Sequence, residues 1–337
     1  MIREAISKVV TGHDLNEEEM VGVMNEIMSG ESSPAQIGSF ITALRMKGET
    51  VDEITGAARV MREKAEKVDA GSGIVVDTCG TGGDSSGTFN VSTAAAFVVA
   101  GAGVTVAKHG NRSITSHCGS ADVLEALGVN LDLPPEQVGR CIREVGIGFM
   151  FAPIMHGAMK HAIGPRREIG IRTVFNVLGP LTNPAGANVQ VMGVFDPDLT
   201  GKLARVLGKL GALRAMVVCG AGNMDELTVT GETRVAEWVD NGVREYAVQP
   251  EDVGLGRAVL EDIRGKNDAA AAAEHLRRIL GGEPGPCLDM VLLNAGAALT
   301  AAGKAADLTA GVELARRTVA GGAPLAKVDG LVAFSAA

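Results

Sequence analysis

The stretch Ile-Val-Val-Asp-Thr-Cys-Gly-Thr-Gly-Gly-Asp-Ser-Ser-Gly-Thr-Phe-Asn-Val-Ser-Thr, residues 74–93, decides the fold. Its first three residues are apolar and β-branched, which predicts a buried strand. Four glycines then fall within eight positions, where the backbone can take positive φ angles and approach a ligand closely. Asn90 and Ser92 are residue types that begin helices, and the apolar run after them predicts one. A strand, a glycine-rich loop and a helix N-terminus together favour an anion site, because free N–H groups and the helix dipole point to one place.

This loop matches neither of two familiar phosphate-binding patterns. A Walker A loop needs a lysine before its Ser or Thr, whereas Thr88 follows Gly87 directly. A dinucleotide fingerprint needs a third glycine where this chain has Ser85. Asp84 would repel a bare phosphate, so it indicates a cation, a sugar hydroxyl or a helix amide as its partner. A plain glycine-rich turn is the alternative.

Composition narrows the class of protein. The chain has 337 residues, a formal net charge of −9 and 3% aromatic residues, which argues against binding nucleic acid. Its five cysteines are scattered and show no Cys-x-x-Cys spacing, as expected for reduced thiols in the cytoplasm. We expect no signal peptide and no membrane contact, because the apolar runs are short and interrupted by charges.

Two patterns divide the chain. The first 70 residues read as helices alone, with capping-box spacing at Asn16–Glu19 and Thr50–Glu53 and a further helix start at Ser33. From residue 74 onward strands alternate with helices, which predicts a largely parallel sheet covered on both faces. The strands expected after the first are 104–108, 147–152, 189–195, 215–219 and 243–248. The helices expected there are 120–127, 136–145, 200–211, 269–280 and 288–302.

We therefore expect an α/β fold with a small all-helical domain and a larger α/β domain that has a central, mostly parallel sheet flanked by helices. The helical domain would comprise residues 1–70, joined by about 170–186, and the α/β domain residues 73–337. Short amphipathic helices bury little surface by themselves, so they must pack on another segment or a second subunit. A homodimer through the helical domain is the expected assembly.

Three further segments carry polar side chains. The loop 108–116 has Lys108 and Arg112 for charge and several hydroxyls, which suits a second phosphate grip, although a solvated surface loop is the alternative. Arg166, among the arginines of 164–173, has a guanidinium suited to a carboxylate or phosphate. Asp225 and Glu226 follow an expected strand and suit Mg²⁺ held through a substrate phosphate, or form an acidic surface pair.

Taken together, these segments resemble the anthranilate phosphoribosyltransferases. The motifs that carry the resemblance are Cys-Gly-Thr-Gly-Gly-Asp at 79–84, Asn-Val-Ser-Thr at 90–93, Lys-His-Gly-Asn-Arg-Ser at 108–113, Gly-Ser-Ala-Asp-Val-Leu-Glu-Ala-Leu-Gly at 119–128, Arg-Thr-Val-Phe-Asn-Val-Leu-Gly-Pro-Leu-Thr-Asn-Pro at 172–184, and the residues Arg166, Asp225 and Glu226. The resemblance implies transfer of the phosphoribosyl group of phosphoribosyl pyrophosphate to the amine of anthranilate, in tryptophan biosynthesis. It also implies a homodimer, a cleft between the two domains, and two Mg²⁺ ions per subunit.

The resemblance assigns roles residue by residue. The pyrophosphate and ribose would be held by Gly80, Gly83, Asp84, Thr88, Asn90, Val91, Ser92 and Thr93. The phosphoribosyl donor would also contact Lys108, His109, Gly110, Asn111, Arg112, Ser113, Ile114, Thr115, Ser116 and Ser120. Asn111 and Arg166 would receive anthranilate with His109 close by, and Ser92, Asp225 and Glu226 would bind magnesium. No catalytic nucleophile or base is implied, since a neutral aromatic amine needs positioning more than activation.

Three positions depart from the family pattern. His117 and Cys118 stand where Lys-Ser is common, and Gly157 follows His156 where proline is usual. None of these removes a charge that the chemistry requires. Pyrimidine nucleoside phosphorylases share the architecture and are the alternative enzyme. A related fold that binds nucleic acid is an alternative of a different class.

Overall fold

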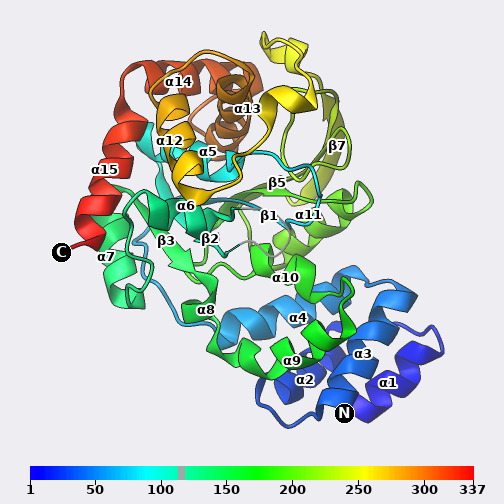
Figure 1. The fold of residues 1–337 in the computed structure, drawn as a ribbon. Coiled ribbons are helices and arrows are strands. Elements are labelled where there is room, and N and C mark those ends of the chain that lie inside the picture. The colour runs from blue at the N-terminus through cyan, green and yellow to red at the C-terminus, as the bar shows by residue number, and fades with distance from the viewer. Residues whose placement is uncertain (113–117) are drawn as a thin grey trace.

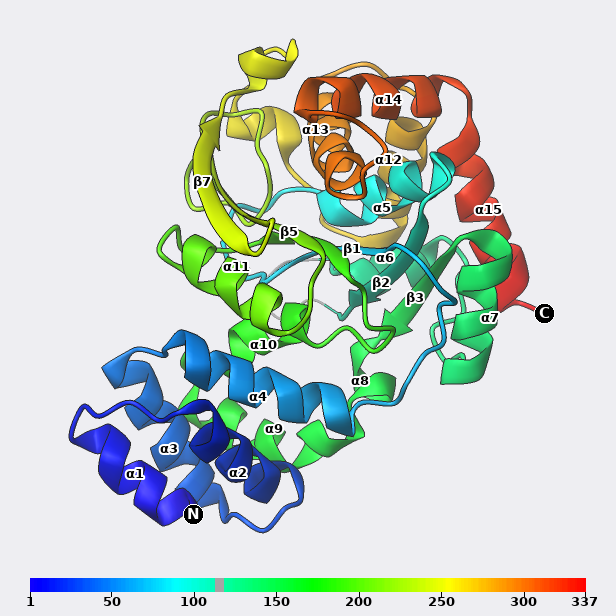
Figure 2. The same ribbon diagram turned by 180° about the vertical axis from the view of Figure 1, so that it is seen from behind.

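A seven-stranded sheet lies between two groups of helices, and the N-terminal helices form a separate group beside it (Figures 1 and 2). The computed structural model describes residues 1–112 and 118–337. Among these residues, no helix is both long enough and apolar enough to cross a bilayer.

The N-terminal group contains four helices: α1 (Ile2–Val10), α2 (Glu17–Met28), α3 (Pro34–Lys47) and α4 (Val51–Lys64). Both predicted capping boxes are confirmed, since Asn16 and Thr50 each accept a hydrogen bond from the backbone N–H three residues on. Ser33 also caps α3. The helix-capping residues in the sequence predicted three of these helices. Helix α1 has no side-chain cap, so capping residues could not reveal it.

Two helices from the middle of the chain return to this group. Helix α9 (Lys160–Ile169) packs against α2 and α3, and α10 (Phe175–Leu181) packs against α4. In Figure 1 the green α9 lies among the blue N-terminal helices. The sequence pattern predicts that about 170–186 joins this group, but α9, which precedes that segment, packs there as well. Pro165 lies inside α9, and a proline inside a helical pattern normally argues against a helix.

The sheet has the order β3-β2-β1-β4-β5-β6-β7. Its strands are β1 (Val75–Gly80), β2 (Thr105–Gly110), β3 (Ile147–Phe151), β4 (Val189–Gly193), β5 (Arg214–Gly220), β6 (Thr233–Val239) and β7 (Gly242–Val248). The first five pair in parallel, whereas β6 and β7 are added antiparallel. The mostly parallel sheet is confirmed. Strand β6 was not predicted, although Asp240 and Asn241, which both have positive φ, mark a hairpin turn after it.

Helices cover both faces of the sheet, as predicted. Helices α5 (Val91–Gly101) and α13 (Pro286–Ala301) pack on one face against Val76, Val106 and Val218. On the other face, Met192 and Val217 join a core that continues through α11 (Leu199–Lys209) into the N-terminal helices. The remaining helices are α6 (Ser120–Ala126), α7 (Pro135–Val145), α8 (Ala152–Met155), α12 (Ala269–Leu280), α14 (Leu308–Ala320) and α15 (Ala323–Ser335). The last two follow residue 302, where the predicted helices end.

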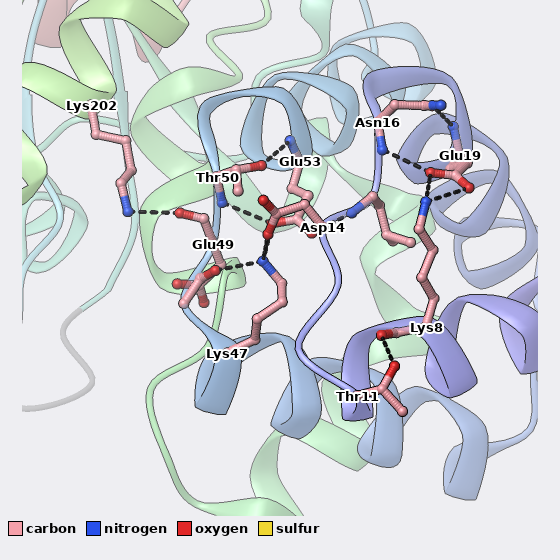
Figure 3. Close-up of polar contacts among 12 residues, drawn as sticks. Lys8, Thr11, Asp14, Asn16, Glu19, Lys47, Glu49, Thr50, Glu53 and Lys202 are labelled. Atoms are coloured by element: carbon pink, nitrogen blue, oxygen red, sulfur yellow. Dashed lines mark hydrogen bonds and ion pairs between the residues drawn. The ribbon is translucent and has the colours of Figure 1, made fainter.

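A buried carboxylate holds three parts of the helical group together (Figure 3). Glu53 is fully buried, and its oxygens accept hydrogen bonds from the backbone of Leu15 at 2.9 Å and of Thr50 at 2.8 Å. The ammonium of Lys47 lies 3.0 Å from Glu53 and 2.6 Å from Asp14. Lys202 of α11 reaches this region from the α/β side and donates to the carbonyl of Glu49 at 2.6 Å. The carboxylate therefore ties the chain before α2 to the α3–α4 turn.

We predict that Lys47→Met lowers the free energy of unfolding by about 3 kcal/mol, because it leaves a buried carboxylate without its cation. Urea denaturation would measure the change. Lys8→Met is the matched control, since the Lys8–Glu19 pair has side chains that are 38% and 39% exposed. Such an exposed pair contributes less than about 1 kcal/mol. Equal losses in the two variants would contradict the role given to Lys47.

Candidate active site

Adjacent parallel strands end on glycine at one edge of the sheet. Gly80 of β1 lies opposite Gly193 of β4 in the register, and β5 ends on Gly220. A Cβ at Gly193 would overlap the backbone of Asp225, and one at Gly80 would overlap its carboxylate. A Cβ at Gly220 would lie 2.7 Å from the carbonyl oxygen of Glu226. The segment that carries the two acids therefore lies directly on the strand ends, where side chains would exclude it.

The glycine-rich loop joins this acidic segment. Gly82 and Gly83 have φ angles of +67° and +74°, as the sequence predicted for a loop that needs glycine. The N–H of Gly82 donates to the Asp225 carboxylate at 2.6 Å, and the N–H of Asp225 donates to Asp84 at 3.4 Å. Asp84 also accepts from the N–H of Ser86 at 3.2 Å, so backbone amides are among its partners within the chain. Arg172, from the segment before α10, donates to the carbonyl of Gly83.

The N-terminus of α5 faces the same acids. Asn90 precedes the helix, as predicted, but its side chain donates to the Cys118 carbonyl at 3.1 Å and does not cap the helix. The N–H of Ser92 instead donates to the Glu226 carboxylate at 3.2 Å. The Glu226 carboxyl group therefore lies at the position where the helix dipole favours an anion. Within the described residues, the buried hydroxyl of Thr93 has no hydrogen-bond partner.

The acids disfavour one another's charged forms. Burial raises the pKa of Asp225 to about 7, and the nearby charge of Asp84 is the second largest cause. Burial and Asp225 also raise the pKa of Glu226 well above its ordinary value. In residues 1–112 and 118–337, no three His, Cys, Asp or Glu side chains converge as a complete protein metal site would. Adjacent carboxylates of this kind fit a divalent cation whose other ligands are substrate oxygens.

The two cations expected in the loop 108–116 differ in their surroundings, because β2 extends to Gly110 and so contains Lys108. Lys108 is buried under the site, where its ammonium donates to the Thr78 carbonyl at 2.6 Å and lies 3.3 Å from the Ser92 hydroxyl. Burial lowers its pKa. Arg112 is exposed and binds Asp122 and Glu125 on α6 at 2.9 and 2.8 Å.

Most of the other expected site residues lie near the glycine-rich loop and the N-terminus of α6, and five lie outside the described residues. The hydroxyl of Ser120 donates to the carbonyl of Asn111 at 3.2 Å, which closes the second loop onto α6. Thr88, at the end of the glycine-rich loop, forms an isolated antiparallel β-bridge with the backbone of Arg264. Val91 begins α5. Gly110 ends β2, where a Cβ would overlap the Ser120 hydroxyl. Ser113, Ile114, Thr115, Ser116 and His117 lie outside the described residues.

Arg166 is a half-buried cation without an acidic partner in the described part of the chain. Its guanidinium lies 5.0 Å from the centre of the Phe175 ring. Burial lowers its pKa, since no carboxylate offsets the loss of water. A guanidinium in this state suits a planar anion from outside the chain.

A buried polar group below the second loop was not foreseen. The imidazoles of His109 and His156 lie 3.2 Å apart, so one ring donates to the other. Burial lowers the pKa of His109 to about 3, and burial with nearby Lys67 lowers that of His156 to about 4. Asn183 donates to both the Asp77 carboxylate and the Ala107 carbonyl at 2.8 Å. This group fixes β1 and β2 to the segment after α10; its members are far apart in sequence, so no local pattern reveals it.

The chain matches two known domain families in order. They are the helical bundle domain of a glycosyl transferase family, over residues 3–65, and the a/b domain of a glycosyl transferase family, over residues 72–325. The anthranilate phosphoribosyltransferase of Desulfotalea psychrophila is 61% identical over 336 residues, which cover 99% of this chain and 97% of that protein. The one of Trichlorobacter lovleyi is 57% identical over 349 residues, with 99% and 100% covered.

Solved structures agree with this match. The crystal structure of anthranilate phosphoribosyltransferase from Thermus thermophilus is 48% identical, has a TM-score of 0.94 and covers 99% of both chains. The enzyme from Saccharomyces cerevisiae in complex with PRPP and Mg is 25% identical, has a TM-score of 0.89, and covers 99% of this chain and 98% of that one.

We predict that His156→Gln makes the protein less sensitive to acid. The folded-state pKa of His156, about 4, lies below the ordinary histidine value. Its contribution to stability is therefore complete above about pH 6.5 and is lost as the pH falls toward 4. Relative to the variant, the wild-type chain should lose about 1.4 kcal/mol per pH unit below pH 6.5.

Urea denaturation at pH 7, 6 and 5 would measure this difference. Asp77, whose pKa is raised to about 6 by burial, titrates in both proteins and cancels in the comparison. Parallel stability profiles for the two proteins would contradict the buried, neutral state of His156.

Proposed function

The chain belongs to the anthranilate phosphoribosyltransferase family, and from this premise we propose how its site carries out the reaction. The enzyme transfers the phosphoribosyl group of 5-phosphoribosyl 1-pyrophosphate to the amine of anthranilate, in tryptophan biosynthesis. The products are N-(5-phosphoribosyl)anthranilate and pyrophosphate. Identity of 61% across nearly the whole chain decides against both the nucleoside phosphorylase and the nucleic-acid-binding alternatives.

One observation carries the mechanism: the Asp225–Glu226 pair lies against both the glycine-rich loop and the N-terminus of α5. The N–H groups of Gly82 and Ser92 hold these two acids beside the loop. Other backbone N–H groups of the glycine-rich loop would be the donors for the departing pyrophosphate. Gly80, Gly83, Asp84, Thr88, Asn90, Val91, Ser92 and Thr93 form this part of the proposed donor site.

Magnesium fits the acidic pair. Ser92, Asp225 and Glu226 would hold the metal, with two ions per subunit. The bound metal supplies positive charge that stabilises the leaving pyrophosphate. The raised pKa values of both carboxylates support this assignment, since a divalent cation removes the repulsion that raises them. The Saccharomyces cerevisiae relative solved in complex with PRPP and Mg supports the same metal.

The remaining donor and acceptor contacts come from the second loop and α9. Lys108, Gly110, Arg112, Ser113, Ile114, Thr115, Ser116 and Ser120 complete the proposed donor site. Asn111 and Arg166 would bind anthranilate, with His109 beside it. A pKa of about 3 makes His109 a poor base at neutral pH, so we assign it contact and packing. Catalysis then depends on placing the amine against the anomeric carbon.

The same proposal covers the organisation of the protein. The helical domain is residues 1–70, joined by about 170–186 and by α9, which packs against α2 and α3. The α/β domain is built from the rest of residues 73–337. The subunits form a homodimer through the helical domain, in the cytoplasm. Val10 on α1 and Met46 on α3 support this interface, because the two helices pack together and these apolar side chains are 62% and 84% exposed.

The direct test of the function follows anthranilate fluorescence in the presence and absence of phosphoribosyl pyrophosphate and Mg²⁺. Consumption that requires both supports the proposal. Consumption that persists after chelation of divalent ions would overturn the role of the metal, and no consumption in the complete mixture would overturn the function.

We predict that Arg166→Ala raises the KM for anthranilate about 30-fold and changes kcat much less, because a charge-assisted contact is worth about 2 kcal/mol. Steady-state kinetics with saturating donor would measure both constants. Arg167→Ala is the control, since Arg167 follows Arg166 in the sequence but has an exposed side chain. A rise in the KM for the donor alone would place Arg166 at the wrong substrate.

We predict that Asp225→Asn combined with Glu226→Gln lowers kcat at least about 100-fold, because charge on the leaving group is no longer stabilised. The KM for anthranilate should stay within about threefold. Glu251→Gln with Asp252→Asn, at an exposed pair of adjacent acids, is the matched control and should leave turnover unchanged. Loss of anthranilate affinity alone in the first double variant would show that the division of roles is wrong.

A further inference from the structure

The acidic pair is held at both of its ends. On the N-terminal side, Gly220 and Met224 exchange two backbone hydrogen bonds of 2.8 and 3.1 Å, which returns the chain onto the end of β5. On the C-terminal side, Leu227 is held by a side chain that comes from α13, on the face of the sheet that α5 also covers. Only Asp225 and Glu226 lie between these two fixed points.

That side chain is Asn294. Its oxygen accepts from the Leu227 N–H at 3.1 Å, and its nitrogen donates to the Leu227 carbonyl at 2.8 Å. The second amide hydrogen is directed to the carbonyl of Met290, at 2.9 Å, one turn earlier in α13. The amide thus binds Leu227 as a neighbouring strand would, although Leu227 belongs to no strand.

The surroundings explain why an amide is used. Asn294 is 2% exposed, and the residues around it on α13, from Met290 to Ala301, are buried and mostly apolar. A polar group in such a place costs stability unless its hydrogen bonds are made. An amide offers a donor and an acceptor on one rigid plane, so it satisfies both backbone groups of Leu227 at once. A hydroxyl or an apolar side chain at this position could not do so.

We propose that Asn294 is a positioning residue for the magnesium–pyrophosphate site. By fixing Leu227, it sets the place of the adjacent Glu226 carboxylate against the N-terminus of α5 and against Asp225. The inference rests on the proposed function, because it gives the acidic pair its metal-binding role. Asn294 itself lies beneath the segment, and among the described residues its side-chain amide bonds to backbone groups of Leu227 and Met290.

The test compares metal binding in the wild-type protein, Asn294→Leu and Asn294→Asp. Mn²⁺ replaces Mg²⁺, and the free ion is counted by electron paramagnetic resonance in the presence of phosphoribosyl pyrophosphate. Asn294→Leu removes all three hydrogen bonds at nearly constant volume, and we expect the Mn²⁺ dissociation constant to rise at least about tenfold. The Mg²⁺ concentration for half-maximal turnover should rise by a similar factor, with the KM for anthranilate within about twofold.

Thr300→Val is the matched control within α13. Thr300 is 3% exposed, and its hydroxyl lies 2.8 and 2.9 Å from the carbonyl oxygens of Gly296 and Asp307, to one of which it donates, away from the acidic segment. This variant should lose thermal stability while keeping wild-type Mn²⁺ affinity. Equal weakening of Mn²⁺ binding in Thr300→Val would overturn the proposal, because the effect would then be a general loosening of α13.

Two further outcomes separate this inference from the proposed function. If Asn294→Leu does not fold, Asn294→Asp tests the proposal. Aspartate keeps the acceptor for the Leu227 N–H but places a carboxylate against the carbonyls of Leu227 and Met290. Mn²⁺ binding should then weaken at least about threefold. Wild-type Mn²⁺ affinity in the folded variants, together with normal wild-type turnover, would overturn the role of Asn294 alone. A wild-type protein that binds Mn²⁺ but does not consume anthranilate would overturn the proposed function. The comparison of Mn²⁺ affinities would then still show whether Asn294 positions the metal site.

Discussion

The site depends on a steric condition: adjacent strands of a parallel sheet end without side chains. Glycine at the ends of β1, β4 and β5 lets the segment with Asp225 and Glu226 lie on the backbone of the sheet itself. The acids can then reach the glycine-rich loop on one side and the first turn of α5 on the other. A side chain at any of these strand ends would have to be accommodated by raising the acids away from the amides that they meet.

The electrostatics follow from that placement. The carboxyl groups of Asp84, Asp225 and Glu226 influence one another's charge near a helix N-terminus and the buried Lys108. The raised pKa values show that the nearby positive charge compensates them incompletely, which is the condition under which a divalent cation binds well. Two arginines of the expected site differ in how far other residues of the chain balance their charge. Arg112 is paired with acids of α6, whereas Arg166 stacks on Phe175 and has no acidic partner in the described part of the chain.

Local signals in the sequence predicted local structure. The capping boxes at Asn16 and Thr50 are complete within four residues, and the glycine-rich loop needs only its own backbone freedom, so both could be recognised from the sequence. Helix α9 could not, because packing against α2 and α3 outweighs the proline inside it. Gly193 and Asn294 act on residues 32 and 67 positions away. Their roles exist only after the chain has folded, so no pattern along the sequence could indicate them.

The return of α9 to the N-terminal helices has a consequence for biosynthesis. On the ribosome, α1 to α4 emerge well before α9, which begins about a hundred residues after α4 ends. The apolar faces that α9 later covers must therefore wait in a nascent chain that is already building the first strands of the sheet. The helical domain is the first to be translated but cannot be the first to be finished. Its completion is linked to the growth of its larger neighbour.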